Sequence, residues 1–250
     1  MSEGPLADKV ALVTGGAGRV GAQIARKLHA QGMKLVIHYR SSEQKAHRLQ
    51  QELHDIRSAS VMLVRGDLLR GPKLFQNLVY ETMEAFGRID VLINNAATFY
   101  PTPIGEAVEK DWEDLIGTNL KAPFFLAQAA ALHLKASQGC IVNMADIYGE
   151  RPLKDHSIYS VAKAGLIMLT KTLARELGPA IRVNAVAPGA ILWPEDGMDE
   201  MNKQRMISRT PLKRIGKPDD IAETVLFLVG NADFITGQVI VVDGGRRVVL

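Results

Sequence analysis

Seven short apolar runs, separated by longer amphipathic stretches, constrain the fold of this 250-residue chain more than any other feature. Runs that are apolar nearly throughout are typical of strands buried on both faces, and their alternation with helix-length segments is typical of a parallel sheet. The expected strands are residues 10–14, 34–39, 60–65, 90–95, 139–145, 181–187 and 237–243, and the expected helices lie near 19–32, 42–57, 71–87, 106–135, 157–177 and 217–230. The sequence therefore predicts an α/β fold: one doubly wound domain over residues 1–250, with helices on both faces of a seven-stranded parallel sheet.

The composition argues against several classes of function. The net charge is only +3 and the basic residues are scattered, so no nucleic-acid partner is expected. No apolar stretch is long enough to span a bilayer and the first residues contain no apolar leader, so no membrane partner is expected. The single cysteine, Cys140, cannot form an internal disulfide, which suits the cytoplasm. The six histidines lack metal-ligand spacing, so no metal site is expected.

A glycine-rich turn, TGGAGRVG at residues 14–21, follows the first strand and precedes the first helix. Gly16, Gly18 and Gly21 fit the pattern G-x-G-x-x-G, which lets a backbone turn tightly and offers the N–H groups of a helix start to a pyrophosphate. The alternative is a strand–helix turn that binds nothing.

A second frame of this turn starts at Gly15 and places Arg19 where a middle glycine is expected, followed by Val20. A cation at a helix N-terminus is unfavourable unless an anion offsets it. We therefore expect Arg19 to contact a phosphate or a flat ligand, rather than to be an ordinary solvated arginine.

The second strand ends in HYRSS, His38 to Ser42, which lacks the acidic residue that would bind a free ribose 2′-hydroxyl. Arg40 and Ser41, beside His38 and Tyr39, offer a cation and a hydroxyl donor instead. These residues predict a 2′-phosphate and hence NADPH, although an ordinary polar loop with an N-cap serine is the alternative.

Further cofactor contacts are expected at the ends of the next two strands. Asp67, followed by Leu68, is placed to meet an adenine edge or to cap a helix. Asn95 and Ala96 end the fourth strand, where cofactor sites of open sheets lie.

The segment YSVAK places Tyr159 and Lys163 four residues apart on one face of an expected helix. A nearby ammonium favours the phenolate, so we expect Lys163 to lower the pKa of Tyr159 and make it a better proton donor. Asp146 lies thirteen residues upstream of Tyr159, and Asn119 is placed to extend a proton relay. Each of these residues alone also has a structural interpretation as a cap or a turn residue.

Together these segments resemble the short-chain dehydrogenase/reductase family over essentially the whole chain. The matching pieces are TGGAGRVG, Gly66 with Asp67, Asn94 to Ala96, Asn119, YSVAK, VNAVAPG at 183–189 and ITGQVIVVDGG at 235–245. The resemblance implies a Rossmann-type fold, a nicotinamide cofactor touching Pro188 and Gly189, and often a homotetramer. It also implies that Tyr159 donates the proton, that Lys163 binds the nicotinamide ribose and tunes Tyr159, and that Asn119 supports the relay.

Two departures from that family, Arg19 for a glycine and Asp146 for the catalytic serine, resemble the pteridine reductase subfamily. LVIHYRSS and NNAATFYPTP at 94–103 carry the same resemblance. It implies that Arg19 contacts pterin and pyrophosphate, that Phe99 stacks on the pterin, and that Asp146 pairs with Tyr159. A carboxylate repels a substrate carbonyl but suits a ligand rich in N–H donors, which supports the same conclusion. A core phenylalanine is the alternative for Phe99.

The residues expected to bind the substrate resemble the subfamily less completely. Ala97 stands where the subfamily carries a serine, and we expect Thr98 to substitute for it. A loop or helical lid over residues 190–214, with Trp193 and Met198, is expected to cover the substrate.

The sequence thus predicts an NADPH-dependent pteridine reductase that transfers hydride to a C=N bond of a dihydropterin, such as dihydrobiopterin, dihydromonapterin or dihydrofolate. The alternatives are a short-chain reductase of another carbonyl or flat aromatic substrate, and a non-catalytic NADPH sensor.

Overall fold

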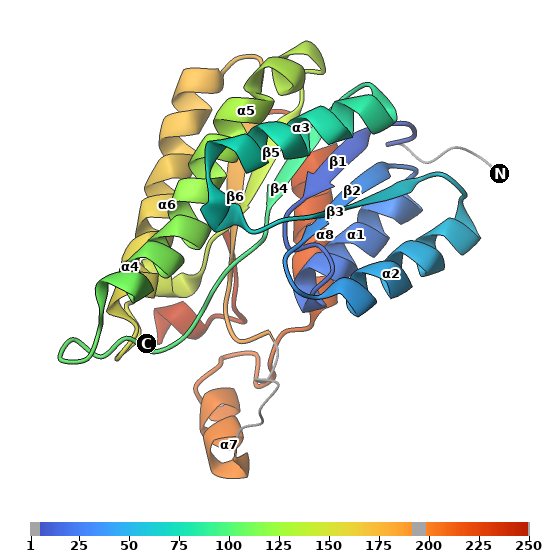
Figure 1. The fold of residues 1–250 in the computed structure, drawn as a ribbon. Coiled ribbons are helices and arrows are strands. Elements are labelled where there is room, and N and C mark those ends of the chain that lie inside the picture. Colours follow the sequence, from blue (N-terminus) through green and yellow to red (C-terminus); the bar gives the residue numbers. More distant parts are fainter. Residues whose placement is uncertain (1–5, 192–198, 250) are drawn as a thin grey trace.

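The computed structural model describes residues 6–191 and 199–249, which form one seven-stranded sheet with helices on both faces (Figure 1). Every neighbouring pair of strands is parallel, and the strand order is β3-β2-β1-β4-β5-β6-β7. The strands are β1 Val10–Val13, β2 Lys34–Tyr39, β3 Val61–Arg65, β4 Val91–Asn94, β5 Cys140–Met144, β6 Arg182–Pro188 and β7 Val239–Val242. The predicted doubly wound fold is confirmed.

The helices form two layers because alternate residues of each strand face opposite sides of the sheet. They are α1 Arg19–Ala30, α2 Glu43–Ile56, α3 Pro72–Phe86, α4 Glu109–Ile116, α5 Ala122–Ala136, α6 Ser157–Leu177, α7 Glu200–Ser208 and α8 Pro218–Gly230. In β1, Val13 packs with α1, α2 and α8, whereas Leu12 packs with α3, α5 and α6. The central strands are therefore covered on both faces, as their continuous apolar runs predict.

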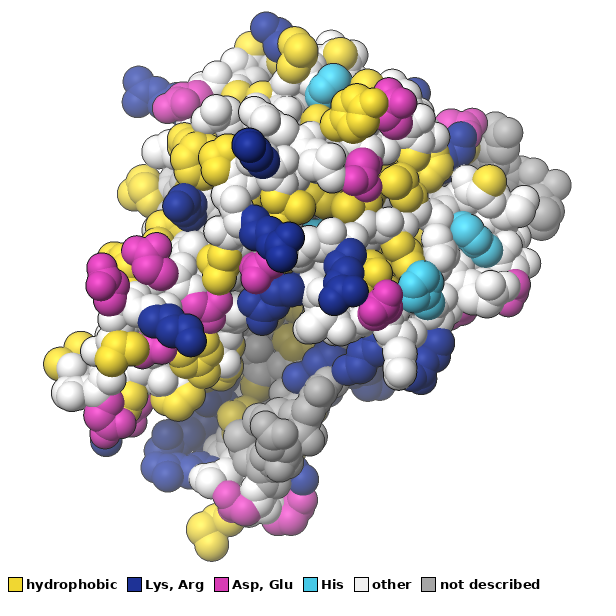
Figure 2. Space-filling model, viewed as in Figure 1, with side chains coloured by type: hydrophobic (Ala, Val, Ile, Leu, Met, Phe, Trp, Pro, Cys, Tyr) yellow, Lys and Arg dark blue, Asp and Glu magenta, His cyan; other side chains and the backbone are white. Residues whose placement is uncertain are grey.

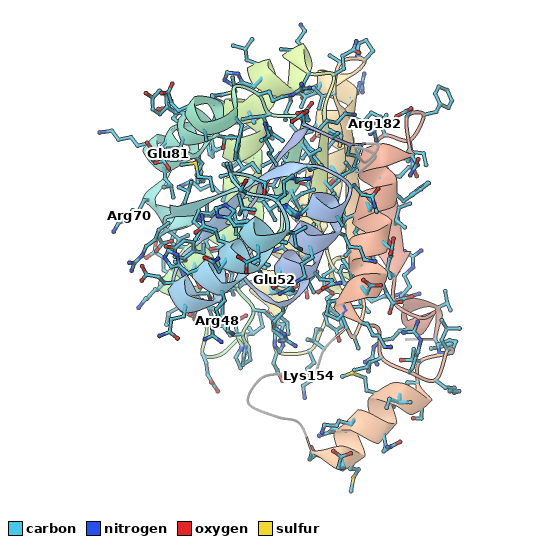
Figure 3. All side chains as sticks on the ribbon, turned by 90° about the vertical axis from the view of Figure 1, so that its right-hand side faces the viewer. Arg48, Glu52, Arg70, Glu81, Lys154 and Arg182 are labelled. Atoms are coloured by element: carbon cyan, nitrogen blue, oxygen red, sulfur yellow. The ribbon has the colours of Figure 1, made fainter. Side chains whose placement is uncertain are left out.

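Side chains also tie the helices to the sheet and to each other (Figure 3). Arg182 at the start of β6 donates to the carbonyl oxygens of Leu228 and Val229, at 2.9 and 3.3 Å, near the end of α8. Glu52 of α2 accepts two hydrogen bonds from Arg26 of α1, at 2.7 and 2.8 Å. Arg182 therefore attaches α8 to β6. The Arg26–Glu52 pair attaches α2 to α1, the helix that follows the glycine turn.

The single helix expected near residues 106–135 is wrong, because the structure divides it. A π-helical turn, Gly117–Lys121, separates α4 from α5, and the Ala122 N–H donates to the Gly117 carbonyl. Pro123 has no N–H to give the Asn119 carbonyl its ordinary helical partner, which accounts for the irregularity at this point. Gly117, Thr118 and Asn119 of this turn are buried.

The expected lid region contains α7, which projects from the body in Figure 1. None of its residues is buried, and Asp199 caps it by accepting from the Asn202 N–H at 2.9 Å. Trp193 and Met198 lie outside the described residues. A lid function for residues 190–214 stays a prediction.

No helix among the described residues is long and apolar enough to cross a membrane.

Candidate active site

The glycine turn is shaped by close backbone approaches. Gly15 has φ of +60°, and a Cβ there would lie 2.9 Å from the Ala96 Cα. A Cβ on Gly21 would lie 2.5 Å from the Gly15 carbonyl oxygen. Both positions therefore require glycine for this chain path. At Gly18 the nearest atom to an added Cβ is 3.8 Å away, an ordinary contact distance, so this position has room for a side-chain carbon.

Thr14 and Asn95 brace the turn from the ends of β1 and β4. The Asn95 side-chain amide donates to the carbonyl oxygens of Thr14 and Gly15, both at 3.0 Å. The Thr14 hydroxyl accepts from the backbone N–H groups of Asn95 and Ala96, at 3.0 and 3.1 Å. The turn is thereby fixed to the point where the strand order reverses, which is the usual ligand position in open α/β sheets.

His38 holds the turn from the other side. Its Nδ1 accepts from the Gly15 N–H at 3.4 Å, and its Nε2 lies 3.1 Å from the Gly66 carbonyl oxygen. Burial lowers the pKa of His38 to about 4, so the ring is neutral at pH 7. We assign the proton to Nε2, because this tautomer satisfies both contacts. His38, expected as a cofactor ligand, thus also joins the ends of β1, β2 and β3.

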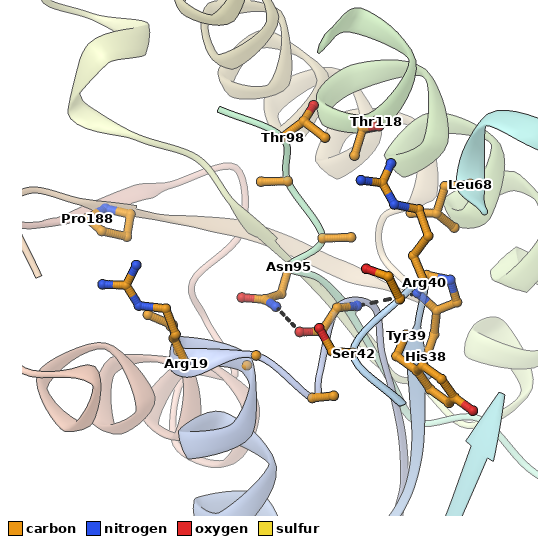
Figure 4. Close-up of a pocket in the computed structure, with 18 of the residues that line it drawn as sticks. Arg19, His38, Tyr39, Arg40, Ser42, Leu68, Asn95, Thr98, Thr118 and Pro188 are labelled. Atoms are coloured by element: carbon orange, nitrogen blue, oxygen red, sulfur yellow. Dashed lines mark hydrogen bonds between the residues drawn. The ribbon is translucent and has the colours of Figure 1, made fainter. Parts of the chain in front are cut away.

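A cavity of about 530 Å³ opens between the glycine turn and the carboxyl ends of the strands (Figure 4). Figure 4 shows Arg19 and Arg40 on opposite sides of it, with Thr98 and Thr118 at one end. Basic side chains also gather along the lower edge of the body in Figure 2. The lining residues are Gly15, Ala17, Gly18, Arg19, Val20, Gly21, His38, Tyr39, Arg40, Ser41, Ser42, Asp67, Leu68, Asn95, Ala96, Ala97, Thr98, Thr118, Tyr159, Pro188, Gly189 and Ile191.

The cavity brings together every expected cofactor residue except Lys163, which is buried behind it. A dinucleotide phosphate fits the first turn of α1, since no side chain caps that helix and no acidic residue lies in its first turn. The Ser42 side chain likewise forms no capping hydrogen bond at the start of α2. Asp67, in contrast, caps the short helix Leu68–Arg70 by accepting from the Leu69 N–H at 3.1 Å.

Arg40, the expected ligand of the 2′-phosphate, faces an unexpected carboxylate. Its Nη1 lies 4.0 Å from Oδ1 of Asp114 in α4. The Arg40 side chain is half exposed, so this contact contributes little energy and can be exchanged for a stronger anion. The cavity is therefore compatible with an anionic group at Arg40.

Asp146, Tyr159 and Lys163 meet at the end of β5. The Tyr159 hydroxyl donates to Oδ2 of Asp146 at 2.8 Å, and the Tyr148 N–H donates to Oδ1 at 2.9 Å. The Lys163 ammonium donates to the Met144 carbonyl at 2.8 Å and lies 5.6 Å from the centre of the Tyr159 ring. Tyr159 and Lys163 are both buried.

The expected effect of Lys163 on Tyr159 is wrong in this structure. Burial and the neighbouring Asp146 carboxylate raise the pKa of Tyr159 well above 10. Burial also raises the pKa of Asp146, against the opposing effects of the Tyr148 N–H and Lys163. Burial lowers the pKa of Lys163 to about 8, and Asp146 opposes that shift. Tyr159 is thus a neutral phenol that donates a hydrogen bond to a carboxylate whose pKa is raised by burial.

Asn119 lies in the π-helical turn, within reach of the substrate segment. Its side-chain amide donates to the carbonyl oxygens of Thr98 and Leu115, at 3.0 and 2.9 Å. Its Oδ1 is buried and has no partner among the described residues. That oxygen is available to a water or a ligand donor, which keeps the expected relay role open.

Phe99 is not a core residue, because 54 % of it is exposed. Its ring meets Tyr159 edge-on, with centroids 4.8 Å apart, and stacks on His156 at 4.7 Å. A half-exposed aromatic ring beside the phenol provides a flat apolar surface for a planar ligand.

Comparison with known proteins matches residues 16–247 to the family model described as "Enoyl-(Acyl carrier protein) reductase". The chain is 36 % identical over 242 residues to the 3-oxoacyl-[acyl-carrier-protein] reductase of Staphylococcus epidermidis, covering 95 % of this chain and 98 % of that protein. It is 39 % identical over 249 residues, with 96 % of each covered, to the (2S)-[(R)-hydroxy(phenyl)methyl]succinyl-CoA dehydrogenase subunit of Thauera aromatica.

The chain belongs to the short-chain dehydrogenase/reductase family. The chain is accordingly an oxidoreductase. A further relative, a putative ketoacyl reductase of granaticin synthesis from Streptomyces violaceoruber, is 35 % identical over 245 residues, covering 95 % of this chain and 96 % of that protein. The names of these three relatives refer to acyl thioesters or a ketoacyl group, not to pterins, so the family expectation is confirmed and the subfamily is not.

Sequence reasoning missed several residues of the candidate site. Thr118 lines the cavity, and His156 stacks on Phe99. Tyr148 supplies the N–H that holds Asp146. The position of Tyr148 two residues after Asp146, in a capped turn, is a local signal that would have identified it, whereas the His156 contact depends on a turn more than fifty residues from Phe99.

Proposed function

We propose that this reductase uses NADPH to reduce a C=N bond of a dihydropterin. The observation that carries the proposal is the hydrogen bond of 2.8 Å between Tyr159 and Asp146, at the position where the family resemblance places a serine. A serine hydroxyl can donate to a substrate carbonyl, whereas a carboxylate repels it. Asp146 therefore favours a substrate that presents N–H donors, as a 2-amino-4-oxopteridine does.

The residues around the cavity fit NADPH. Gly18 presents backbone without a Cβ to the cavity, and the uncapped start of α1 offers N–H donors for the pyrophosphate. Arg40, Ser41 and Ser42 would hold the 2′-phosphate, with Arg40 exchanging its weak contact to Asp114 for a stronger anion. When bound, NADPH supplies the hydride that a pterin C=N carbon accepts.

Proton delivery is the task of this chain's own residues. Tyr159 lines the cavity, and its hydroxyl is hydrogen-bonded to Asp146, which does not line the cavity and serves as a proton reserve. Because burial raises the pKa of Asp146, its carboxyl holds a proton at higher pH than an ordinary aspartate does. The Lys163 ammonium lies 5.6 Å from the centre of the Tyr159 ring and supplies positive charge when protonated. Tyr159 and Asp146 thus pass one proton to a ring nitrogen of the pterin, and a proton from solvent then replaces it.

Substrate binding in this proposal rests on Phe99, Arg19 and Thr98. The exposed part of the Phe99 ring offers the stacking surface. Arg19 and Thr98 both line the cavity and provide polar contacts along the edge of a flat ligand. Trp193 stays a proposed lid residue.

Reduction of a 3-oxoacyl thioester is the second candidate, and the names of the relatives favour it. Both candidates use Tyr159 as the proton donor, and they differ in what Asp146 contributes. The carboxylate helps only the nitrogen-rich substrate.

The test is NADPH oxidation, followed by its nicotinamide absorbance, with dihydrobiopterin, dihydromonapterin, dihydrofolate and a 3-oxoacyl thioester. Tyr159→Phe serves as the control for proton delivery. Turnover of a pterin that this variant loses supports the proposal. Turnover of the thioester alone would replace it with the second candidate, and NADPH binding without any turnover would point to a sensor.

A further inference from the structure

Arg246 is a buried arginine in the turn after β7. Only 8 % of it is exposed, although arginine is rarely buried without a charged partner. It forms no ion pair within the described part of the chain, and its Nε is buried there without an acceptor. A buried guanidinium that lacks a carboxylate costs free energy, so its position calls for an explanation other than charge neutralisation.

The guanidinium joins two segments that are distant in sequence. Nη1 donates to the Met206 carbonyl of α7 at 3.3 Å. The guanidinium also lies near the Tyr148 side chain; burial raises the pKa of Tyr148, and the positive charge of Arg246 opposes that rise. The backbone N–H of Tyr148 in turn holds Oδ1 of Asp146. One side chain thus contacts both α7 and the residue that orients Asp146.

The backbone that carries Arg246 is fixed. Gly244 and Gly245 adopt φ of +64° and +85°. The Asp243 carboxylate accepts from the N–H groups of Gly245 and Arg247, at 2.8 and 2.6 Å. The Leu212 N–H, just beyond α7, donates to the Gly244 carbonyl at 3.1 Å. The turn is therefore a rigid base from which Arg246 reaches its two partners.

We infer that Arg246 is a positioning residue that fixes α7 and Tyr148 relative to Asp146, and so sets the shape of the substrate side of the site. Its link to catalysis rests on the proposed role of Asp146. Loss of Arg246 should act mainly on substrate KM, because Arg246 does not line the cofactor cavity. Removing one or two hydrogen bonds corresponds to a rise in KM of about tenfold.

The adjacent Arg247 offers a matched control. It pairs with Glu150, directly after the short helix Ile147–Gly149 that contains Tyr148. The side chains of Arg247 and Glu150 are both more than a third exposed. Arg247→Met therefore removes an arginine contact from the same turn to the same region without touching Tyr148 or α7.

The experiment compares Arg246→Met, Arg246→Lys, Tyr148→Phe and Arg247→Met. It measures substrate KM and kcat, the Kd of NADPH, and the rate of trypsin cleavage within α7 at Lys203 and Arg205. Arg246→Met should raise KM about tenfold and accelerate cleavage in α7, with an unchanged Kd for NADPH. Arg246→Lys should show a smaller rise in KM and slower cleavage in α7 than Arg246→Met. Tyr148→Phe should raise KM without accelerating cleavage.

Equal effects of Arg247→Met and Arg246→Met, or unchanged KM and cleavage in Arg246→Met, would overturn the inference. If Arg246→Met does not fold, the substrate KM and the cleavage rate of α7 in Arg246→Lys and Tyr148→Phe test the inference in its place. Cleavage of α7 requires no substrate, so it tests the link to α7 even if no pterin is turned over. Failure of the proposed function is therefore distinguishable from failure of this inference.

Discussion

The glycine turn permits a quantitative test at Gly21. A Cβ at this position would lie 2.5 Å from the Gly15 carbonyl oxygen and 2.6 Å from the Asn95 side-chain nitrogen. Alanine at Gly21 would therefore displace the Asn95 amide and break its two hydrogen bonds to the turn, each 3.0 Å long. The turn would lose its attachment to the end of β4.

The expected destabilisation by Gly21→Ala follows from three contributions. Two lost hydrogen bonds cost about 0.5–1.5 kcal/mol each, or about 1–3 kcal/mol together. Crowding of well-packed backbone costs about 1–3 kcal/mol more. The higher helix propensity of alanine returns about 1 kcal/mol. The free energy of unfolding should therefore fall by about 1–5 kcal/mol, with the steric effects outweighing propensity.

The assay is urea unfolding followed by far-ultraviolet circular dichroism, together with the Kd of NADPH from fluorescence titration. Gly18→Ala is the matched control, since its φ of −96° suits alanine and its Cβ would contact nothing closer than 3.8 Å. That variant should keep or slightly gain stability but bind NADPH more weakly, because its methyl group enters the cavity. A Gly21→Ala variant as stable as the wild type would refute this reasoning.

Three further predictions concern the site. Tyr159→Phe should lower turnover about 10²–10⁴-fold while NADPH still binds, as single-turnover and titration measurements will show. Phe99→Ala should raise the KM for a dihydropterin several-fold, as expected for loss of a stacking contact worth about 0.5–1.5 kcal/mol, with little change in melting temperature because Phe99 is 54 % exposed. The lowered pKa of His38, about 4 against 6.5, means that the unfolded state binds one more proton between these pH values. Stability contributed by His38 is thus present above pH 6.5 and lost as the pH falls through about 4. His38→Leu should reduce the pH slope of the unfolding free energy by about one proton, leaving the slope due to His29, whose pKa burial also lowers to about 4; an unchanged slope would contradict the assigned neutral ring.

The fold could be predicted from the sequence because its determinants are local. Each buried strand is a largely apolar run, and the helices that pack on the sheet turn apolar residues toward it. The π-helical turn at Gly117–Lys121 was not predicted, because an irregular backbone hydrogen bond leaves no change in the apolar pattern. Pro123 was the available indication that the helix is interrupted.

The arrangement of the site could be predicted only for functional residues that lie close together in the sequence. Tyr159 and Lys163 share a helix face, so their proximity could be predicted from spacing alone. The direction of the Tyr159 pKa shift could not, because it depends on burial and on how close Asp146 lies. The contacts of Arg246 with Met206 and Tyr148 likewise join segments that are distant in sequence, which no spacing indicates.

The central claim is that Asp146 adapts the family's proton-donating tyrosine to a nitrogen-rich substrate. The most direct measurement is kcat/KM for dihydrobiopterin and for a 3-oxoacyl thioester, in the wild type and in Asp146→Ser. We predict that the wild type prefers the pterin and that Asp146→Ser lowers the ratio of the two values by at least about 100-fold. A wild type that prefers the thioester, with a ratio that Asp146→Ser leaves unchanged, would contradict the account.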